Sequence, residues 1–287
     1  MSPKIVYAVT SVGKDTYSVM TRISVASARL SCPGTRVMLA CDEVSAREME
    51  KTRDLLLYDV DEVMVVPTPE GNATYRNRHI KTRLRTLLEG EFLFMDSDTI
   101  VRGDLSALNS IEGDIAAAPN HSADSLEAQI WDEDRDHLTQ MGWSVANTYF
   151  NGGLIFYRDT AAARALACEW HHRWAEGFRK TGRANDQPAF NASIAAMEIR
   201  VETLPHRYNA QFTMNQSSAS EALVWHYYST DTSLRNTTIG ALIKSVMKNE
   251  VIPNKKLVRV IRSRKPWKLL YLKNHVKHCS FLVSAHP

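Results

Sequence analysis

The chain has 287 residues, of which 44% are hydrophobic and 23% are charged, and its formal net charge is +3. These values are ordinary for a globular protein with one sizeable core or two modest ones, so composition permits an enzyme without identifying one. The four cysteines show no CxxC spacing, which argues against a structural zinc site or a disulfide framework and favours a reducing compartment. The N-terminal residues lack the pattern of a signal peptide, and no stretch of about 18 apolar residues occurs, so we expect a cytoplasmic protein that does not span a membrane.

The charge is unevenly distributed along the chain. Residues 244–287 contain 11 of the 35 Lys and Arg residues but only one of the 32 acidic residues, Glu250. The rest of the chain therefore has an excess of acidic residues. This contrast predicts an acidic body, residues 1–243, and a basic C-terminal tail, residues 244–287, with different roles.

The first hundred residues alternate between short apolar runs and segments of helical composition. We predict strands at residues 4–10, 36–41, 62–66 and 91–95, and helices at residues 16–29, 46–58 and 79–88. Further strands are predicted at residues 114–118 and 149–157, with helical potential at residues 125–140 between them. Strands that alternate with helices predict an α/β fold with a largely parallel sheet, in which ligands bind beyond the carboxyl ends of the strands. No internal repeat or flexible linker interrupts the body, which favours one domain plus the tail.

Asp96-Ser97-Asp98 directly follows the apolar residues of the fourth predicted strand. Two carboxylates at positions i and i+2 of an extended chain project to the same side, where both can approach one divalent cation. Such a triplet also fits an acidic turn or a helix cap. Its place after a buried strand favours the cation site, because a buried acidic pair without a partner is costly.

Several ordered blocks of sequence share a pattern. They are FMDSDTIV at residues 94–101 with GDL at 103–105, YFNGGLI at 149–155, NDQPAFN at 185–191, LP at 204–205 with YN at 208–209, and WHY at 225–227. In this order and spacing the chain resembles glycosyltransferase family 8, whose members are retaining enzymes of the GT-A fold. The resemblance extends from about residue 4 to residue 228. It implies a Rossmann-like, mostly parallel central sheet with flanking helices and an enzyme that moves a hexose from a UDP-sugar to a saccharide or glycolipid acceptor.

The resemblance also implies roles for individual residues. Asp96, Asp98 and His226 would bind Mn²⁺ or Mg²⁺, and a mixed carboxylate and imidazole set suits Mn²⁺. The donor would contact Ala8, Val9, Thr10, Tyr17, Lys81, Asp96, Ser97, Gly152 and Gly153. Asn151, Asp186 and Gln187 would face the transferred sugar as the catalytic residues.

Simpler roles compete with some of these assignments. Lys81 is favoured over Arg83 and Arg85 as the cation near the donor phosphates, and the other two would then be solvated helix charges. His226 also fits a buried core histidine, and Asp186 fits a helix N-cap, a role compatible with catalysis. The mechanism implied is metal-assisted departure of the nucleoside diphosphate, with or without a protein nucleophile.

The match to the family is incomplete after the histidine. The family usually continues with glycine and a nearby Lys-Pro-Trp that contacts the diphosphate, whereas here Lys265-Pro266-Trp267 lies 39 residues beyond His226, where a chance match is favoured over an insertion. Asn120 also occupies a position where the family often has aspartate.

Two other functions fit parts of the sequence. A haloacid-dehalogenase-like phosphatase also has an Asp pair after a strand, but Ile100 occupies its Thr/Val position. A non-catalytic nucleotide-sugar-binding or membrane-adaptor protein is the other alternative.

The tail has its own pattern from residue 267 onward. Apolar residues recur there at helical spacing with lysines beside them, which suits peripheral contact with an anionic membrane or, equally, packing on the body. Nucleic acid is a poorer partner because the body is acidic and no binding motif occurs.

Overall fold

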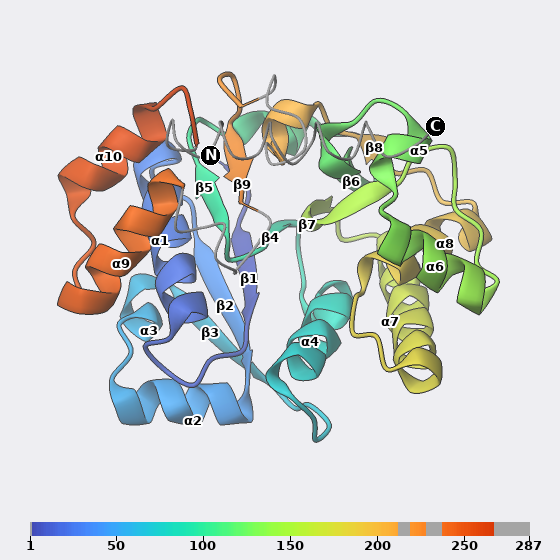
Figure 1. Cartoon of the computed structure of the whole chain (residues 1–287), viewed down its shortest axis with the longest axis horizontal. Coiled ribbons are helices and arrows are strands. Elements are labelled where there is room, and N and C mark those ends of the chain that lie inside the picture. Colours follow the sequence, from blue (N-terminus) through green and yellow to red (C-terminus); the bar gives the residue numbers. More distant parts are fainter. Residues whose placement is uncertain (1, 212–218, 228–236, 267–287) are drawn as a thin grey trace, which may run out of the picture.

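The computed structural model describes residues 2–211, 219–227 and 237–266. Within these residues the centre of the molecule is a seven-stranded sheet with the order β3-β2-β1-β4-β7-β6-β8, flanked by helices (Figure 1). A separate two-stranded sheet joins β5 and β9. The predicted α/β fold is confirmed.

Four parallel strands form one side of the central sheet. They are β1 (Ile5–Val9), β2 (Val37–Asp42), β3 (Glu62–Val66) and β4 (Phe92–Met95). Every residue of β1, β2 and β4 is buried, as expected for parallel strands covered on both faces. Because the strands are parallel, their carboxyl ends meet along one edge, which is where Asp96 follows β4.

The other side of the sheet contains the one strand that runs against the rest. β7 (Phe150–Tyr157) is antiparallel to β4 and to β6 (Ile115–Pro119), and β8 (Glu202–Thr203) is parallel to β6. The β4–β7 register pairs Met95 with Leu154. The amino end of β7 therefore lies beside the carboxyl end of β4.

Different helices cover the two faces of the sheet. On one face α4 (Ala73–Leu87), α7 (Ala161–Thr181) and α8 (Gln187–Met197) pack over β1 and β7 through an apolar cluster that includes Leu84 and Trp170. On the other, α1 (Thr16–Ser31), α2 (Glu43–Thr52), α3 (Leu56–Asp59) and the short helix η1 (Ser106–Ser110) enclose a second cluster. Both faces of the central strands are thus removed from water.

Two predicted helices are each divided in two. The helix expected at residues 46–58 is α2 and α3, because Arg53 has a left-handed backbone with φ of 51° and the Asp54 carboxylate then accepts the Leu56 amide at 3.0 Å. The helical stretch at residues 125–140 is α5 (Leu126–Gln129) and α6 (Asp132–Met141), with extended residues at Ile130 and Trp131 between them. In addition, α4 begins six residues before the predicted start, where Asn72 caps it.

The small sheet brings distant parts of the chain together. β5 (Thr99–Val101) pairs antiparallel with β9 (Val224–His226), and Thr99 lies opposite His226. Two further short helices lie nearby, η2 (Asn120–Ser122) and η3 (His206–Tyr208).

Two helices form the described part of the basic C-terminal segment. α9 (Thr238–Asn249) packs against α1, and α10 (Asn254–Arg262) contacts both. Arg102, which follows β5, donates to the Ile261 and Ser263 carbonyls and stacks on the Trp225 ring at 3.9 Å. The expected boundary after residue 243 falls within α9, and the helix expected from residue 267 lies outside the described residues. No helix in the described ranges is long and apolar enough to cross a membrane.

Candidate active site

The Asp96-Ser97-Asp98 turn joins β4 to β5 and is fixed from both sides. The Asp96 amide donates to the Gly153 carbonyl of β7 at 2.8 Å, and the Thr21 hydroxyl of α1 donates to Ser97 Oγ at 2.8 Å. The Thr99 hydroxyl closes the turn by donating to the Asp96 carbonyl at 2.8 Å. These contacts hold the two carboxylates at the edge where the parallel strands end.

Three possible metal ligands converge at this turn. Asp96, Asp98 and His226 each offer one ligand atom, and these atoms lie within 4.8 Å of one another. His226 Nε2 is 3.2 Å from Asp98 Oδ1, and the imidazole is almost completely buried. Two carboxylates and an imidazole in this arrangement are a donor set for a divalent cation such as Mn²⁺. The structure thus brings together the three side chains that the sequence analysis assigns to a metal.

The charges of this cluster affect one another. Burial alone lowers the pKa of His226, but the nearby Asp98 and Asp96 carboxylates outweigh it, and the net pKa is raised. Burial raises the pKa of Asp98, yet the His226 charge and its hydrogen bond leave that pKa below its usual range. The Asp98 carboxylate is therefore held ionised, the state in which it can bind a cation.

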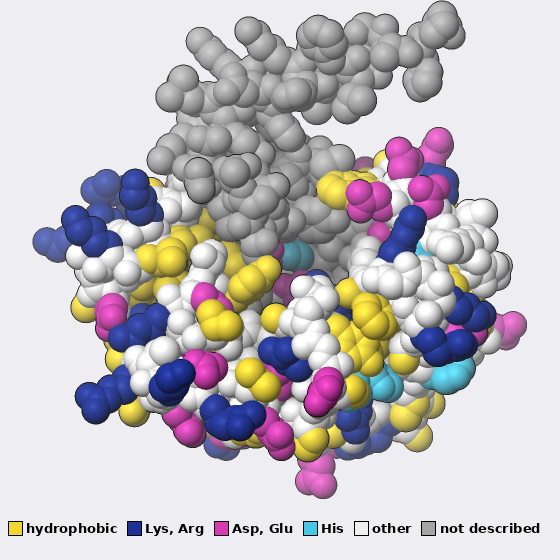
Figure 2. Space-filling model, turned by 60° about the horizontal axis from the view of Figure 1, so that its bottom comes forward, with side chains coloured by type: hydrophobic (Ala, Val, Ile, Leu, Met, Phe, Trp, Pro, Cys, Tyr) yellow, Lys and Arg dark blue, Asp and Glu magenta, His cyan; other side chains and the backbone are white. Residues whose placement is uncertain are grey.

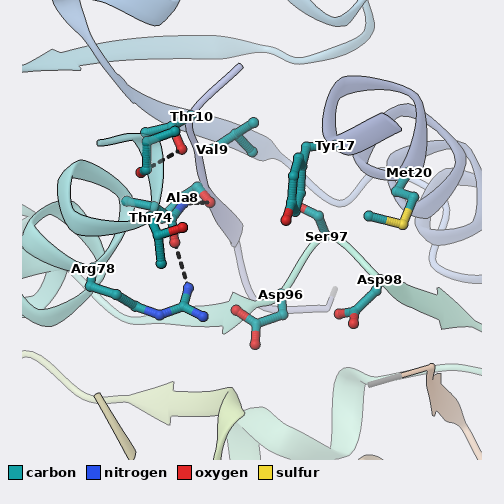
Figure 3. Close-up of a pocket in the computed structure, with 12 residues that line it drawn as sticks. Ala8, Val9, Thr10, Tyr17, Met20, Thr74, Arg78, Asp96, Ser97 and Asp98 are labelled. Carbon is teal, nitrogen blue, oxygen red and sulfur yellow. Dashed lines mark hydrogen bonds between the residues drawn. The ribbon is translucent and has the colours of Figure 1, made fainter. Parts of the chain in front are cut away.

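A cavity of about 250 Å³ opens beside the two carboxylates (Figure 3). Asp96 and Asp98 lie side by side at one end, and Tyr17 of α1 lies on the same wall as Ser97. Six of the predicted donor residues line it, namely Ala8, Val9, Thr10, Tyr17, Asp96 and Ser97, whereas Lys81, Gly152 and Gly153 do not. The lining also includes Met20, Ala73, Thr74, Asn77 and Arg78, which the sequence analysis does not identify.

The first two turns of α4 form the second wall of this cavity. Asn77 donates from its amide to the Ala8 carbonyl at 2.9 Å, and the Thr10 hydroxyl donates to the Ala73 carbonyl at 2.9 Å. These bonds tie α4 to the end of β1. A signal for this wall exists in the sequence, because Asn77 and Arg78 lie four and three residues before Lys81, which is one helical turn. The sequence analysis misses them because its predicted helix begins only at residue 79, whereas α4 begins at Ala73.

Lys81 is the helix cation that reaches the acidic turn. Its Nζ is 3.4 Å from Asp96 Oδ1 and 3.3 Å from Asp186 Oδ2, and the side chain is buried. Arg83 instead lies 3.0 Å from the His79 ring. Arg85 donates to the Leu88 and Gly90 carbonyls at the end of α4, away from the turn. The structure places only Lys81 of these three cations at the site.

Asp186 precedes α8 but its side chain does not cap that helix. It has no side-chain cap hydrogen bond, and its carboxylate instead pairs with Arg78 Nε at 2.8 Å and with Lys81. Because the Asp186 carboxylate does not bond to the first amides of α8, it can interact with a bound ligand. Its position at the start of α8 comes from Pro188, whose fixed φ suits the first turn.

The residues expected to face the sugar form one hydrogen-bonded group with β7. Asn151 Oδ1 accepts the Gly153 amide at 2.9 Å, and Gln187 Oε1 accepts the Gly152 amide at 3.0 Å. A Cβ atom on Gly152 would face Lys81 and Asp186, whereas a Cβ atom on Gly153 would face His226 and Asp96. Asn151, Gly152, Gly153 and Gln187 thus lie between the acidic turn and Asp186.

Asp134 of α6 is a further buried carboxyl behind this group. It accepts hydrogen bonds from the Tyr149 hydroxyl at 2.9 Å, from Asn185 at 2.6 Å and from Gln187 at 3.4 Å. Burial raises its pKa to about 6, although the three donors oppose the shift. The sequence analysis misses Asp134, because its helix α6 contains four acidic residues and lacks a pattern that separates the buried one.

Asn120 and the Lys265-Pro266 pair, at which the sequence departs from the family pattern, lie in different surroundings. Asn120 lies beside the sugar-facing group, where its side-chain oxygen accepts from Asn151 at 2.9 Å. The Pro266 carbonyl accepts from the Thr238 hydroxyl at 3.0 Å, and that hydroxyl lies 3.0 Å from Tyr227 Oη, next to His226. Lys265 is exposed.

Comparison with known proteins agrees with this geometry. The family model described as glycosyl transferase family 8 matches residues 59–268. The galactosyltransferase LgtC, solved in complex with donor and acceptor sugar analogues, superposes with a TM-score of 0.57 at 14% identity, covering 88% of this chain and 98% of that chain. Mouse xyloside xylosyltransferase 1 gives a TM-score of 0.52 at 12% identity, covering 79% of this chain and 98% of that chain. The glycosyltransferase GlyE of Streptococcus pneumoniae TIGR4 gives 0.55 at 15% identity, covering 93% and 65%. No curated protein matches the chain.

The fold, the convergent donor set and these likenesses define a glycosyltransferase of the GT-A fold. The family model covers well over half of the residues. The chain belongs to glycosyltransferase family 8.

Proposed function

We propose that the chain is a metal-dependent retaining glycosyltransferase that moves a hexose from a UDP-sugar to a saccharide or glycolipid acceptor. The observation that carries this proposal is the convergence of Asp96, Asp98 and His226, because the two aspartates of this cluster also line the cavity beside β1. A nucleotide in that cavity would place its diphosphate at the three ligands. Family membership supports the reaction class, and the cavity supports the donor class.

The donor nucleotide fits the wall formed by the end of β1 and by α1. Tyr17 is half exposed there and offers an aromatic face to a base, while Thr10 and Thr74 add hydroxyl groups. Ser97 is held by Thr21. We expect the ribose and base to lie between α1 and α4, with the diphosphate toward Asp96.

The cation, Mn²⁺ or Mg²⁺, would neutralise the negative charge on the departing diphosphate. Lys81 lies between Asp96 and Asp186 and adds a positive charge on the same side. Asp186 is oriented by Arg78 at 2.8 Å, so its carboxylate can face the positive charge that develops on the sugar. Asn151 and Gln187 accept hydrogen bonds from the amides of Gly153 and Gly152 in β7. Because glycine has no side chain, the backbone of β7 could approach the sugar closely there.

Replacing one carboxylate by the matching amide tests the metal site. Asp98→Asn keeps the shape of the side chain but removes the charge that binds the cation, so we expect the Mn²⁺-dependent increase in melting temperature with UDP-sugars to disappear and transfer to fall at least about 100-fold. Thermal-shift measurements across a panel of nucleotide-sugars, with and without Mn²⁺, would also identify the donor. Asp104→Asn is the control, since Asp104 is exposed and bonds only to Ser2 and Ser106 among the described residues.

The outcomes of this experiment separate the alternatives. Transfer that survives in Asp98→Asn would contradict the site assignment. Mn²⁺-dependent UDP binding by the unmodified chain, without turnover on a broad acceptor panel, would instead favour a non-catalytic nucleotide-sugar-binding or adaptor protein.

We also propose peripheral contact with an anionic membrane at the cytoplasmic face through the basic C-terminal segment. α10 supports this, because Leu257 and Val260 face the body while Lys255, Lys256, Arg259 and Arg262 are exposed. A surface of this kind would bring the site to a glycolipid acceptor.

A further inference from the structure

A row of four buried side chains connects the two halves of the proposed active site. Asn120 Oδ1 accepts from Asn151 Nδ2, Asn151 Oδ1 accepts from Asn209 Nδ2, and Asn209 Oδ1 faces His226 Nδ1, each at 2.9 Å. The exposed fraction of each residue is 3% or less. The row begins in η2, crosses β7 and ends at a proposed metal ligand on β9.

The direction of every hydrogen bond in this row follows from two backbone groups. The Gly153 amide can only donate, and it lies 2.9 Å from one end of the Asn151 side chain, which must therefore be the oxygen. The Gln129 carbonyl can only accept, and it lies 2.7 Å from one end of Asn120, which must be the nitrogen. Both anchors give the same orientation for Asn151, so its amide is not an arbitrary choice between oxygen and nitrogen.

The orientation of Asn209 then determines the state of the histidine. Because Asn151 Oδ1 can only accept hydrogen bonds, the end of Asn209 that faces it must be Nδ2, and the Asn209 oxygen then faces His226. An oxygen facing Nδ1 requires that Nδ1 hold a hydrogen. In the neutral ring the lone pair is consequently on Nε2, the nitrogen that lies 3.2 Å from Asp98 Oδ1 and would bind the cation.

We propose that Asn209 is a positioning residue that fixes the Nδ1–H form and the ring angle of His226 and couples them to Asn151. The proposal rests on the proposed function, since it assigns His226 to a cation and Asn151 to the sugar. Asn151 also donates to Gln187 Oε1 at 3.2 Å, so the row extends to the start of α8. A metal bound at His226 and a sugar bound at Asn151 would therefore each favour the same arrangement of Asn209.

The tautomer can be measured in the unmodified chain. Two-bond ¹⁵N–¹H spectra of the full, uniformly ¹⁵N-labelled protein, recorded at a pH where the His226 ring is neutral, should show Nδ1 protonated and Nε2 unprotonated. The His226→Ala spectrum identifies which signals belong to this residue. Protonation of the neutral ring at Nε2 would overturn the proposal, whatever the activity of the enzyme.

Substitution of Asn209 tests the coupling. Asn209→Leu keeps the approximate volume but leaves the hydrogen of His226 Nδ1 and the Asn151 oxygen without this partner, and we expect Mn²⁺ affinity, measured by titration calorimetry, to fall 10- to 100-fold. The kcat should fall as well, whereas UDP affinity without metal should not change. If Asn209→Leu does not fold, Asn209→Asp keeps the oxygen that faces Nδ1–H but sets a second oxygen against Asn151 Oδ1, so the Nδ1–H tautomer should persist while kcat falls.

A matched control separates positioning from general destabilisation. Asn191 is a buried asparagine that accepts from the Phe150 amide at 2.6 Å and donates to the Phe150 carbonyl at 2.9 Å and to the Gln187 carbonyl at 3.0 Å, so all three bonds are to backbone groups. Asn191→Leu should reduce stability yet leave the Mn²⁺ affinity of the folded protein unchanged. Unaltered Mn²⁺ affinity and kcat in both Asn209 variants would refute the proposed coupling in an active transferase, whereas normal Mn²⁺ binding without transfer in the unmodified chain would refute only the proposed function.

Discussion

Asp134 is a buried carboxyl whose ionisation opposes folding. Only 6% of the residue is exposed, and burial raises its pKa to about 6 even with hydrogen bonds from Tyr149, Gln187 and Asn185. The nearby Asp186 charge adds to the shift. By accepting these hydrogen bonds, Asp134 holds Gln187 and Asn185 in place. Asp134 thus helps to order the residues that are proposed to face the sugar, at a cost in stability.

We expect this cost to depend on pH in a defined direction. A group whose pKa is raised on folding stabilises the protein below its unfolded pKa, near 4, and loses that contribution as the pH rises through about 6. The free energy of unfolding of the unmodified protein should thus fall relative to that of Asp134→Asn by about 2 kcal/mol between pH 4 and pH 7. Urea unfolding of both proteins at several pH values measures this difference. The corresponding difference between the unmodified protein and the exposed control Asp136→Asn should not change in this way.

Single residues differ in how far their roles could be predicted. The proposed ligands Asp96 and Asp98 stand out because two acids after an apolar strand form an unusual pattern. Lys81 could be chosen over Arg85 only by resemblance, since both lie on a predicted helix and their directions depend on packing. Arg78 could not be recognised, because its partner Asp186 is 108 residues away in the sequence and adjacent only in the fold.

At the scale of elements, β7 supplies both sides of the site through two consecutive glycines. A Cβ atom on Gly153 would lie 2.3 Å from His226 Cε1 and 2.7 Å from Asp96 Oδ2. A Cβ atom on Gly152 would lie 3.7 Å from Lys81 Nζ and 3.8 Å from Asp186 Oδ2, which is ordinary contact. Successive residues of a strand face opposite sides, so these glycines make room for two different groups.

The two glycines therefore provide a matched pair of substitutions. Gly153→Ala should force His226 and Asp96 apart and reduce Mn²⁺ affinity at least about tenfold, as displaced ligands and their supports do elsewhere. Gly152→Ala should leave Mn²⁺ affinity unchanged and instead raise the KM for the donor, since the methyl group would occupy space next to Lys81. Calorimetric titration with Mn²⁺ measures the first effect and steady-state kinetics the second. Equal Mn²⁺ affinities for both variants would contradict this division of β7.

The strands could be predicted more completely than their arrangement. The apolar run at residues 91–95 indicates β4 closely, because buried parallel strands are continuously hydrophobic. Residues 62–66 indicate β3, an edge strand in which only Val66 is buried. Residues 149–157 indicate β7 but carry no sign that it runs antiparallel, since direction is decided by its pairing with β4 and β6. The break between α2 and α3 was also not predictable, because it depends on the left-handed backbone of Arg53.

At the scale of the whole molecule, the basic helices α9 and α10 lie together at one side of the body (Figure 1). The exposed lysines and arginines of α9 and α10 gather at one side of the molecule, the left in Figure 2. Met247 and Val251 are exposed apolar residues at the turn between these helices. Basic residues around exposed apolar ones form a surface that suits an anionic bilayer.

We expect this surface to bind vesicles in a salt-dependent manner. Each basic residue near an anionic bilayer contributes about 1 kcal/mol, so changing Lys255, Lys256, Arg259 and Arg262 together to Gln should weaken binding by roughly 1,000-fold. Co-sedimentation of the full chain with vesicles rich in phosphatidylglycerol measures this, and phosphatidylcholine vesicles give the background. An equal loss of charge at Arg47, Lys51, Arg179 and Lys180, all exposed elsewhere, is the control. Similar binding by both variants would show that net charge alone is responsible.

The organisation of the C-terminal segment was only partly predictable. Its basic composition is plain in the sequence, yet α9 packs on α1 through Leu242 and Val246, apolar side chains that the charge count does not reveal. The contacts of Arg102 with the Ile261 and Ser263 carbonyls further join α10 to the end of β5. The first part of the basic segment is thereby integrated into the body.

The pairing of β5 with β9 has a consequence for the protein as it is synthesised. Thr99 and His226 are neighbours in the small sheet, but the ribosome adds more than a hundred residues between Asp98 and the proposed third ligand. A nascent chain that has not yet reached β9 presents only the two aspartates. Tight binding of a cation would therefore require that nearly the whole described body has left the ribosome. The bound ion would then stabilise the contact between β5, which is synthesised early, and β9, which is synthesised late.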